Sequence, residues 1–137
     1  MSTILIIEDD FMLAEEWKHF LTKETNHKVQ VIGKASEALA LIEQKLPDIL
    51  IADLYHRDAF GSLKGDNGIR IMGPLKRQYP QLKIIAITAY NNVDRVVPTE
   101  TVVLNLGADY FLGKPFEPAD LLMKIKEVEE DIKREKM

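Results

Sequence analysis

The sequence contains no cysteine, which excludes both a disulfide framework and a thiolate metal site. It also lacks a long uncharged apolar run, and it begins with a short β-type segment rather than with a basic stretch and an apolar signal core. Basic residues are not in excess, since 18 Lys and Arg stand against 22 Asp and Glu for a net charge of -4. That balance gives no broad attraction for nucleic acid or an anionic membrane. We therefore expect a cytoplasmic protein that binds neither nucleic acid nor a membrane directly.

The chain does contain enough apolar material for one hydrophobic core. It has 137 residues, of which 46% are hydrophobic and 29% are charged. This length is too short for two ordinary domains, and no internal repeat or linker interrupts the pattern. We therefore expect a single domain over residues 1–137.

Short runs rich in β-branched residues alternate with stretches of helical spacing, which predicts five strands and five helices. The strand-like runs are Thr3–Ile7, Lys28–Gly33, Ile49–Asp53, Lys83–Ile87 and Asp109–Leu112. Five helical stretches are predicted in chain order: one that begins at Phe11, then Ser36–Lys45, Gly68–Tyr79 and Val93–Leu106, and a last one that begins at Pro118. The first and third runs are apolar without alternation, as in strands covered on both faces. Right-handed crossovers then predict an α/β fold, a doubly wound parallel sheet with helices on both faces.

The first helical stretch has one apolar side, and Asp10 is placed to cap its start. The residues on the apolar side are Phe11, Ala14, Trp17, Phe20 and Leu21. This pattern predicts that the helix lies on the sheet. We interpret Trp17 and Phe20 as core residues rather than as a stacking platform for a ligand.

The last helical stretch carries an apolar stripe into a mostly charged end over residues 124–137. The stripe consists of Leu121, Ile125, Val128 and Ile132. One interpretation is a docked helix with a solvated end. The other is the start of a dimerising or signalling helix that leads to an output domain.

Polar side chains follow the predicted strands at the points where these strands end. Glu8 and Asp9 follow the first strand, Asp53 ends the third, Thr88 follows the fourth and Lys114 follows the fifth. Ligands of such sheets bind beyond the carboxyl ends of the strands, so these five side chains are expected to converge.

Glu8, Asp9 and Asp53 would repel one another there unless their pKa values rise or a cation sits among them. Hard oxygen ligands favour Mg²⁺, which takes one or two carboxylates together with phosphate oxygens. Mg²⁺, Lys114 and the Thr88 hydroxyl would together bind the three equatorial oxygens of a phosphoryl group. Asp53 is then the nucleophile that receives this group.

Each of these residues alone has a simpler explanation. An Asp after a strand is often only a helix cap, which is the role assigned to Asp10. A lone Thr at a strand end is usually a β-former, and a lone Lys before Pro is usually a solvated loop charge. Only their coincidence at one edge of one sheet supports a site.

The motifs that carry this chemistry resemble the response-regulator receiver domain of two-component systems, nearly from end to end. They lie in the segments Ile4–Asp10, Pro47–Asp53, Ile85–Ala89 and Gly107–Phe116. The resemblance implies the flavodoxin-like strand order 2-1-3-4-5. It also implies a signalling domain rather than an enzyme. The only reactions that such a domain catalyses are its own phosphoryl transfer and its slow self-dephosphorylation.

By position, the resemblance makes Asp53 the phosphoacceptor and Asp9 a direct Mg²⁺ ligand. Glu8 is similar to the second acid that holds the metal through water, and the backbone carbonyl of Tyr55 is the remaining protein ligand.

The same resemblance implies that Thr88 and Lys114 sense and neutralise the phosphoryl group. The Lys114-Pro115 bond is similar to one that is usually cis. Phe111 stands where the family often has a switch Tyr, so Thr88 and Phe111 are the expected switch residues.

The resemblance further implies a sensor histidine kinase or a phosphotransfer protein as phosphodonor. The resemblance is also compatible with a homodimer through the fourth helix, fifth strand and fifth helix, and with a C-terminal output domain.

Two stretches depart from the family pattern. About seven extra residues precede Asn67-Gly68 after the phosphoacceptor, a length that a surface loop tolerates. The stretch between Thr88 and Lys114 is also longer than usual. In this family two side chains border the path by which water attacks the acyl phosphate. One lies two residues after the phosphoacceptor, and the other lies two residues after the Thr that corresponds to Thr88. Both are Tyr here, Tyr55 and Tyr90, which predicts slow self-dephosphorylation.

Three other functions compete with this interpretation. A Mg²⁺-dependent phosphate hydrolase usually needs a second Asp two residues after the nucleophile, where this chain has Tyr55. A nucleotide-binding fold needs a glycine-rich phosphate turn after the first strand, where this chain has Glu8, Asp9 and Asp10. A receiver-like interaction module that is never phosphorylated remains open because of the altered loop after Asp53.

Overall fold

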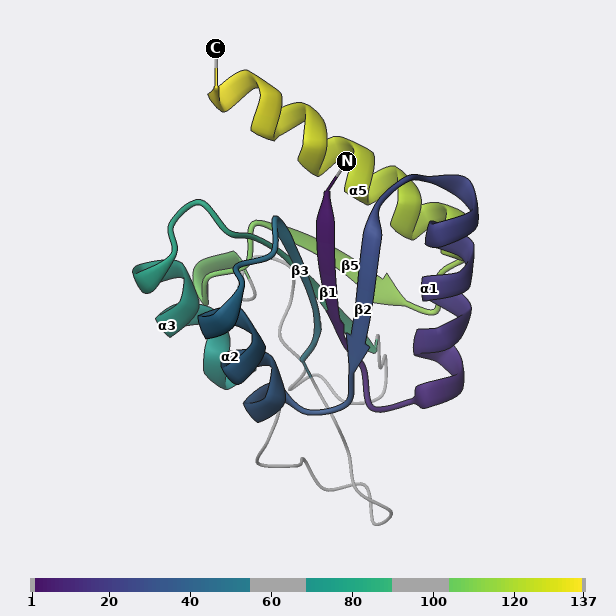
Figure 1. Ribbon diagram of the computed structural model, residues 1–137, viewed down its shortest axis with the longest axis horizontal. Helices are drawn as coiled ribbons and strands as arrows, with labels where there is room; N and C mark the ends of the chain where they lie inside the picture. The colour runs from purple at the N-terminus through teal and green to yellow at the C-terminus, as the bar shows by residue number, and fades with distance from the viewer. Residues whose placement is uncertain (1, 55–68, 90–103, 137) are drawn as a thin grey trace.

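The computed structural model describes residues 2–54, 69–89 and 104–136. They form a five-stranded parallel sheet in the order β2-β1-β3-β4-β5, with helices on both faces (Figure 1). The strands are β1 (Thr3–Ile7), β2 (Lys28–Ile32), β3 (Ile49–Asp53), β4 (Lys83–Ala89) and β5 (Tyr110–Lys114). The predicted doubly wound sheet and its 2-1-3-4-5 order are therefore confirmed.

The apolar strands β1 and β3 lie side by side in the middle of the sheet. Ile6 of β1 pairs with Ile51 of β3, and neither side chain is accessible to solvent. Burial on both faces explains why these strands are apolar without alternation. Their pairing also brings their carboxyl ends together, which places Glu8 next to the end of β3.

The ends of β4 and β5 differ from the prediction. β4 continues past Ile87 to Ala89, and β5 begins at Tyr110 and continues to Lys114. The two strands extend because Ala89 pairs with Lys114. Such pairing depends on the neighbouring strand, so the apolar pattern of a single run could not reveal it. As a result, Lys114 is held in the sheet rather than in a loop.

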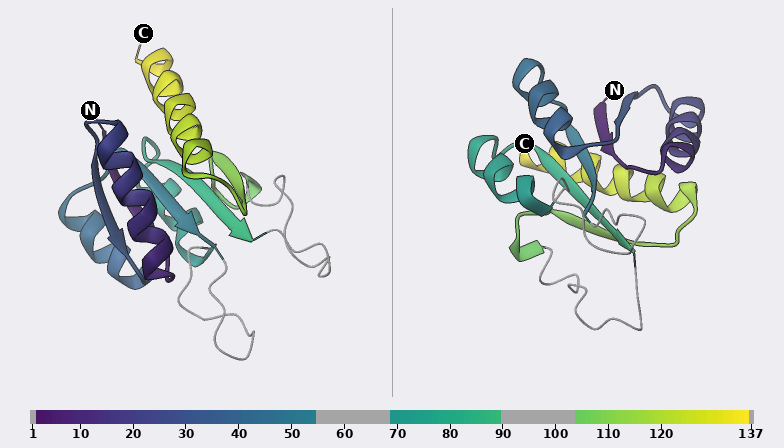
Figure 2. Two further views of the ribbon diagram at one scale, coloured as in Figure 1. Left: turned by 90° about the vertical axis from the view of Figure 1, so that its right-hand side faces the viewer. Right: turned by 90° about the horizontal axis from the view of Figure 1, so that it is seen from below.

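Helices from both halves of the chain cover the two faces of the sheet (Figure 2). The helices are α1 (Phe11–Glu24), α2 (Ala35–Gln44), α3 (Ile69–Gln78) and α5 (Pro118–Glu135). One core cluster joins α1 and α5 to the sheet, and a second joins α2 and α3 to the opposite face. Most of the predicted helix Val93–Leu106 lies outside the residues that the structure describes.

Helix α1 begins at the edge where β1 ends, and its apolar stripe is shorter than predicted. Ala14, Trp17 and Leu21 are buried, and Phe20 packs against the same cluster. Phe11 was predicted on this stripe, but it is 71% exposed. Leu13 packs against the same cluster and Ala14 is fully buried, so packing on the core begins within the first turn and leaves out Phe11, the first residue of the helix.

Asp10 caps α1 as predicted, since its Oδ1 accepts a hydrogen bond of 3.1 Å from the backbone N–H of Leu13. We expect Asp10→Ala to lower the free energy of unfolding by about 1 kcal/mol, because one N–H at the helix start loses its acceptor. Urea denaturation measures this loss. Asp10→Asn should be close to wild type, since an Asn side chain also caps; equal losses in both variants would show that the cap does not stabilise the helix.

The stripe of α5 docks on the sheet as predicted. Leu121, Ile125 and Val128 are buried, and Ile132 packs against their cluster. In the parts of the chain that the structure covers, no helix is long and apolar enough to cross a membrane.

Polar contacts hold the C-terminal half of α5 against the sheet. Glu129 accepts a hydrogen bond from Ser2 Oγ at 3.2 Å and pairs with His27 Nε2 at 3.1 Å. Further along, Glu135 pairs with Lys83 at 2.6 Å. The charged end of the helix is therefore docked by two hydrogen bonds of Glu129 and by the Lys83–Glu135 ion pair, as well as by its apolar stripe.

Candidate functional site

Four strands bring the predicted site residues to the carboxyl edge of the sheet. Glu8 and Asp9 directly follow β1, Asp53 is the last residue of β3, and Lys114 is the last residue of β5. Thr88 lies near the end of β4 and pairs with Gly113. Because β3 and β5 flank β4, the Lys114 side chain reaches across the end of β4 to arrive at Asp53.

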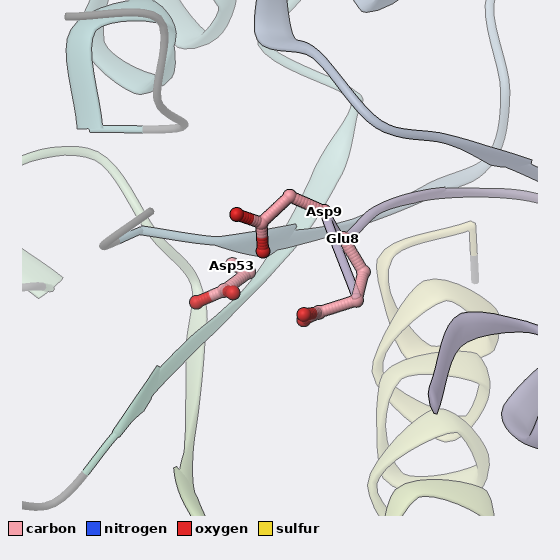
Figure 3. Close-up of side chains that lie close together, drawn as sticks. All are labelled: Glu8, Asp9 and Asp53. Carbon is pink, nitrogen blue, oxygen red and sulfur yellow. The ribbon is translucent and has the colours of Figure 1, made fainter. Parts of the chain in front are cut away.

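The three acidic side chains converge (Figure 3). One carboxylate oxygen from each of Glu8, Asp9 and Asp53 lies within 4.8 Å of the others. Glu8 is 2% exposed and Asp53 is 3% exposed, whereas Asp9 is open to solvent. The cluster therefore has two buried oxygen donors and one exposed one, an arrangement accessible from one side.

Lys114 bridges the two buried acids. Its Nζ donates to Glu8 Oε2 at 2.9 Å and to Asp53 Oδ2 at 3.2 Å. The Lys114 side chain itself is 21% exposed. Charge-assisted hydrogen bonds of this kind are stronger than neutral ones, particularly where water is excluded. The ammonium group therefore neutralises part of the charge in the cluster.

Burial and the mutual charges of the groups shift the pKa values of this cluster. Burial raises the pKa of Glu8 to about 7, and the charge of Asp53 adds to the rise while Lys114 opposes it. Burial also raises the pKa of Asp53, against the lowering effect of Lys114. For Lys114, burial alone lowers the pKa, but the charges of Asp53 and Glu8 outweigh it and raise the pKa overall. A further positive charge near these oxygens would favour the ionised carboxylates.

Trp17 and Phe116 line the same site, a feature that the sequence did not reveal. Lys114 Nζ lies 5.7 Å from the centroid of the Trp17 ring. The Phe116 ring stacks on Trp17 with a centroid distance of 5.2 Å and an interplanar angle of 24°. Trp17 is a core residue as predicted, at 2% exposure, but its ring also lies beside the ammonium group of Lys114. The available signal was a large aromatic residue on the first helix together with Phe116 two residues after the functional lysine.

Two other predicted residues, Thr88 and Phe111, lie on the strands β4 and β5. Thr88 is buried, with 1% exposure, between the strands that carry Asp53 and Lys114. Phe111 is half-buried on β5 and packs against the core cluster under α2 and α3. The Lys114–Pro115 peptide bond is cis, as the resemblance implied. Tyr55, with the loop around it, and Tyr90 lie outside the described residues, so their predicted roles stay predictions.

The donor set suits a hard divalent cation. It consists of carboxylate oxygens alone, with no sulfur or imidazole in the cluster of Glu8, Asp9 and Asp53. Mg²⁺ prefers oxygen ligands and usually retains several waters, so a partly open set of carboxylates fits it. The same oxygens, with an ammonium and a hydroxyl nearby, suit the transfer of an anionic group onto a carboxylate.

Comparison with known proteins gives a consistent result. The family model described as response regulator receiver domain matches residues 4–126. The sensory transduction protein RegX3 of Mycolicibacterium smegmatis is 31% identical over 129 residues, which cover 93% of this chain and 50% of that protein. The response regulator protein FleR of Pseudomonas aeruginosa is 29% identical over 119 residues, covering 87% of this chain and 23% of that protein. The chain therefore spans half or less of the length of these two curated relatives.

Among solved structures, a CheY-like response regulator receiver domain protein from Methanospirillum hungatei aligns with a TM-score of 0.79 and 29% identity. The alignment covers 98% of both chains. The receiver domain of NtrX from Brucella abortus aligns with a TM-score of 0.74 at 24% identity, over 91% of this chain and 96% of that one. At that identity the second likeness concerns the fold alone.

Proposed function

This chain belongs to the response regulator receiver domain family, and from that premise we propose that it receives a phosphoryl group on Asp53 in the presence of Mg²⁺. Receiver domains of this family act in signal transduction and are not metabolic enzymes. One observation carries the proposal: a lysine ammonium bridges Asp53 and Glu8 beside Asp9, all at the carboxyl edge of the sheet.

Asp53 is the proposed acceptor because its carboxylate is buried beside Lys114, while the neighbouring Asp9 leaves the cluster accessible to solvent on one side. One of its carboxylate oxygens attacks the phosphorus of the donor, and the bond between phosphorus and the donor atom breaks. The electron pair of that bond leaves with the donor, which is the imidazole of a phosphohistidine or the acetate of acetyl phosphate. Asp53 then carries an acyl phosphate. No proton transfer from Asp53 is needed if it is ionised, so a nearby positive charge favours the reactive form.

Lys114 and Thr88 are the proposed phosphoryl-binding side chains. Lys114 already contacts Asp53 at 3.2 Å, so its ammonium is close to where the new oxygens would lie. Exchange of the Glu8 contact for a phosphoryl oxygen would keep the ammonium paired throughout. Thr88 offers a hydroxyl from the end of β4, next to β3.

Glu8, Asp9 and Asp53 are the residues that would hold Mg²⁺, with the Tyr55 carbonyl as the further proposed ligand. When bound, the ion supplies positive charge to the phosphoryl oxygens. Asp9 and Asp53 would contact it directly, and Glu8 would act through water. The pairing of Glu8 with Lys114 supports this division, because one oxygen of Glu8 is already engaged.

The proposal is tested by phosphorylation with a small donor. Wild-type protein incubated with acetyl phosphate should gain one phosphoryl group with Mg²⁺ present and little or none after chelation, as read by intact-protein mass spectrometry. Asp9→Ala should slow labelling by about 10-fold or more, because one exposed cation ligand is lost. Asp10→Asn is the matched control, since it changes the adjacent acid while it keeps the helix cap.

Other outcomes have clear meanings. Labelling that is independent of Mg²⁺ would contradict the metal assignment. No labelling of wild-type protein under any condition would favour an interaction module that is never phosphorylated. Hydrolysis of phosphate esters, which do not label the protein, would instead favour a hydrolase.

We further propose the partners and the switch that the family suggests. A sensor histidine kinase or phosphotransfer protein would supply the phosphoryl group. Since this chain spans half or less of RegX3 and FleR, an output domain would accompany it in a longer protein. Movement of Thr88 towards the phosphoryl oxygens would let Phe111 turn, which would alter self-association through β5 and α5.

A further inference from the structure

We propose that Trp17 is a positioning residue for phosphoryl transfer: its indole face holds the Lys114 ammonium over the acidic cluster. The inference rests on the proposed function of Asp53 and adds to it a residue on α1 that donates nothing to the metal or to the phosphoryl group. Its basis is the distance of 5.7 Å between Lys114 Nζ and the Trp17 ring centroid, which is within the range of a cation–π interaction.

Lys114 needs such support because its ammonium group must be held at a fixed position by a long and flexible side chain. It must reach from β5 across the end of β4 to Asp53 on β3 and Glu8 beyond it. A lysine side chain has four rotatable bonds and loses much conformational freedom when its ammonium is fixed. A rigid surface beneath the side chain restricts the alternatives before any substrate arrives.

An aromatic face suits this role better than another acid would. The site must accept a phosphoryl group, which is an anion, while it already contains three carboxylates. A fourth carboxylate that held Lys114 would repel that anion further. The face of an indole attracts a cation through its quadrupole without adding net negative charge. Trp17 can therefore keep Lys114 in place while Lys114 exchanges Glu8 for a phosphoryl oxygen.

The Trp17 ring is itself fixed. It is 2% exposed in the cluster that joins α1 and α5 to the sheet. Phe116 stacks on it at 5.2 Å between centroids. Since Phe116 lies two residues after Lys114, the ring contacts the chain on both sides of Pro115. Trp17 thus orients the turn between β5 and α5 as well as the ammonium.

The test compares two variants of similar volume, Trp17→Phe and Trp17→Met. Both shrink the core, but only Met lacks an aromatic face. The measured quantity is the rate of phosphorylation by acetyl phosphate at saturating Mg²⁺, at a temperature where both variants are folded by circular dichroism. We expect Trp17→Met to be slower than wild type by about threefold to tenfold, and Trp17→Phe to stay within about twofold. Should Trp17→Met fail to fold, Trp17→Leu and Trp17→Tyr provide a second pair.

A spectroscopic test addresses the contact without phosphorylation. Trp17 is the only tryptophan of the chain, so its fluorescence reports on this site alone. Lys114→Met, which keeps the apolar stem and removes the charge, should change the emission of the folded protein. Lys124→Met is the control, because Lys124 lies on α5 and pairs with Glu127 at 3.2 Å. Emission that is equal in both variants and wild type would overturn the proposed contact.

The failures of the two proposals are distinguishable. If wild-type protein is not phosphorylated, the proposed function fails, while the emission of Lys114→Met still tests the contact. If wild-type protein is phosphorylated and the Phe and Met variants react at equal rates, Trp17 is a core residue only and the positioning role is wrong.

Discussion

Replacement of Asp53 by asparagine is expected to abolish phosphoryl incorporation from small donors and from any kinase. An amide has no anionic oxygen to attack phosphorus, and it cannot form the acyl phosphate. The variant keeps the shape of a side chain that is 3% exposed at the end of β3, so a loss of folding is not the expected cause. Intact-protein mass spectrometry before and after incubation with acetyl phosphate and Mg²⁺ measures the result.

Asp48→Asn serves as the control for this experiment. Asp48 precedes the opposite end of β3, where its carboxylate accepts a hydrogen bond from the Thr3 backbone at 2.9 Å. The Asp48→Asn variant should be labelled at the wild-type rate, because residue 48 is remote from Lys114 and the acidic cluster. Undiminished labelling of Asp53→Asn would instead mean that another residue is the acceptor.

The second large effect is a pH dependence of stability that originates in Glu8. Its pKa is about 7 in the folded chain against 4.5 ordinarily, so the folded state binds more protons than the unfolded state between these values. Stability must then fall as pH rises through that window. The full shift corresponds to about 3 kcal/mol for this side chain, which has 1% exposure. The raised pKa of Asp53 acts in the same direction.

Urea denaturation of metal-free protein at several pH values between about 4.5 and 7.5 measures this dependence. Glu8→Gln should flatten the curve, because the amide does not titrate. Mg²⁺ should raise stability mostly at the upper end of the range, where the carboxylates are ionised and bind it. If wild type and Glu8→Gln have parallel curves, Glu8 is not the group responsible.

Much of the fold could be predicted because the signals are local. The apolar runs of β1 and β3 indicated buried central strands, and the alternation of strands and helices then left few topologies. The polar residues at strand ends could be assigned to one edge for the same reason. Phe11 shows the limit of such patterns, since helical spacing does not reveal at which residue the packing of a helix against the core begins.

The arrangement within the site was predicted less completely. Glu8 was expected at the metal and Lys114 at the phosphoryl group, but the structure also joins them at 2.9 Å. That contact depends on the conformation of a long side chain among several acids, which no sequence spacing encodes. The contact of Trp17 with Lys114 could not be predicted for a similar reason, because an apolar helical stripe indicates that a ring is buried but not which side chain lies over it.

The most direct test of the central claim is to identify the phosphorylated residue chemically. Protein labelled by acetyl phosphate with Mg²⁺ is treated with borohydride, which reduces an aspartyl phosphate to homoserine, and the digest is sequenced by tandem mass spectrometry. The account predicts homoserine at position 53 alone, dependent on both the donor and Mg²⁺. Homoserine at another aspartate, or a phosphoryl group that resists reduction on a hydroxyl side chain, would contradict it.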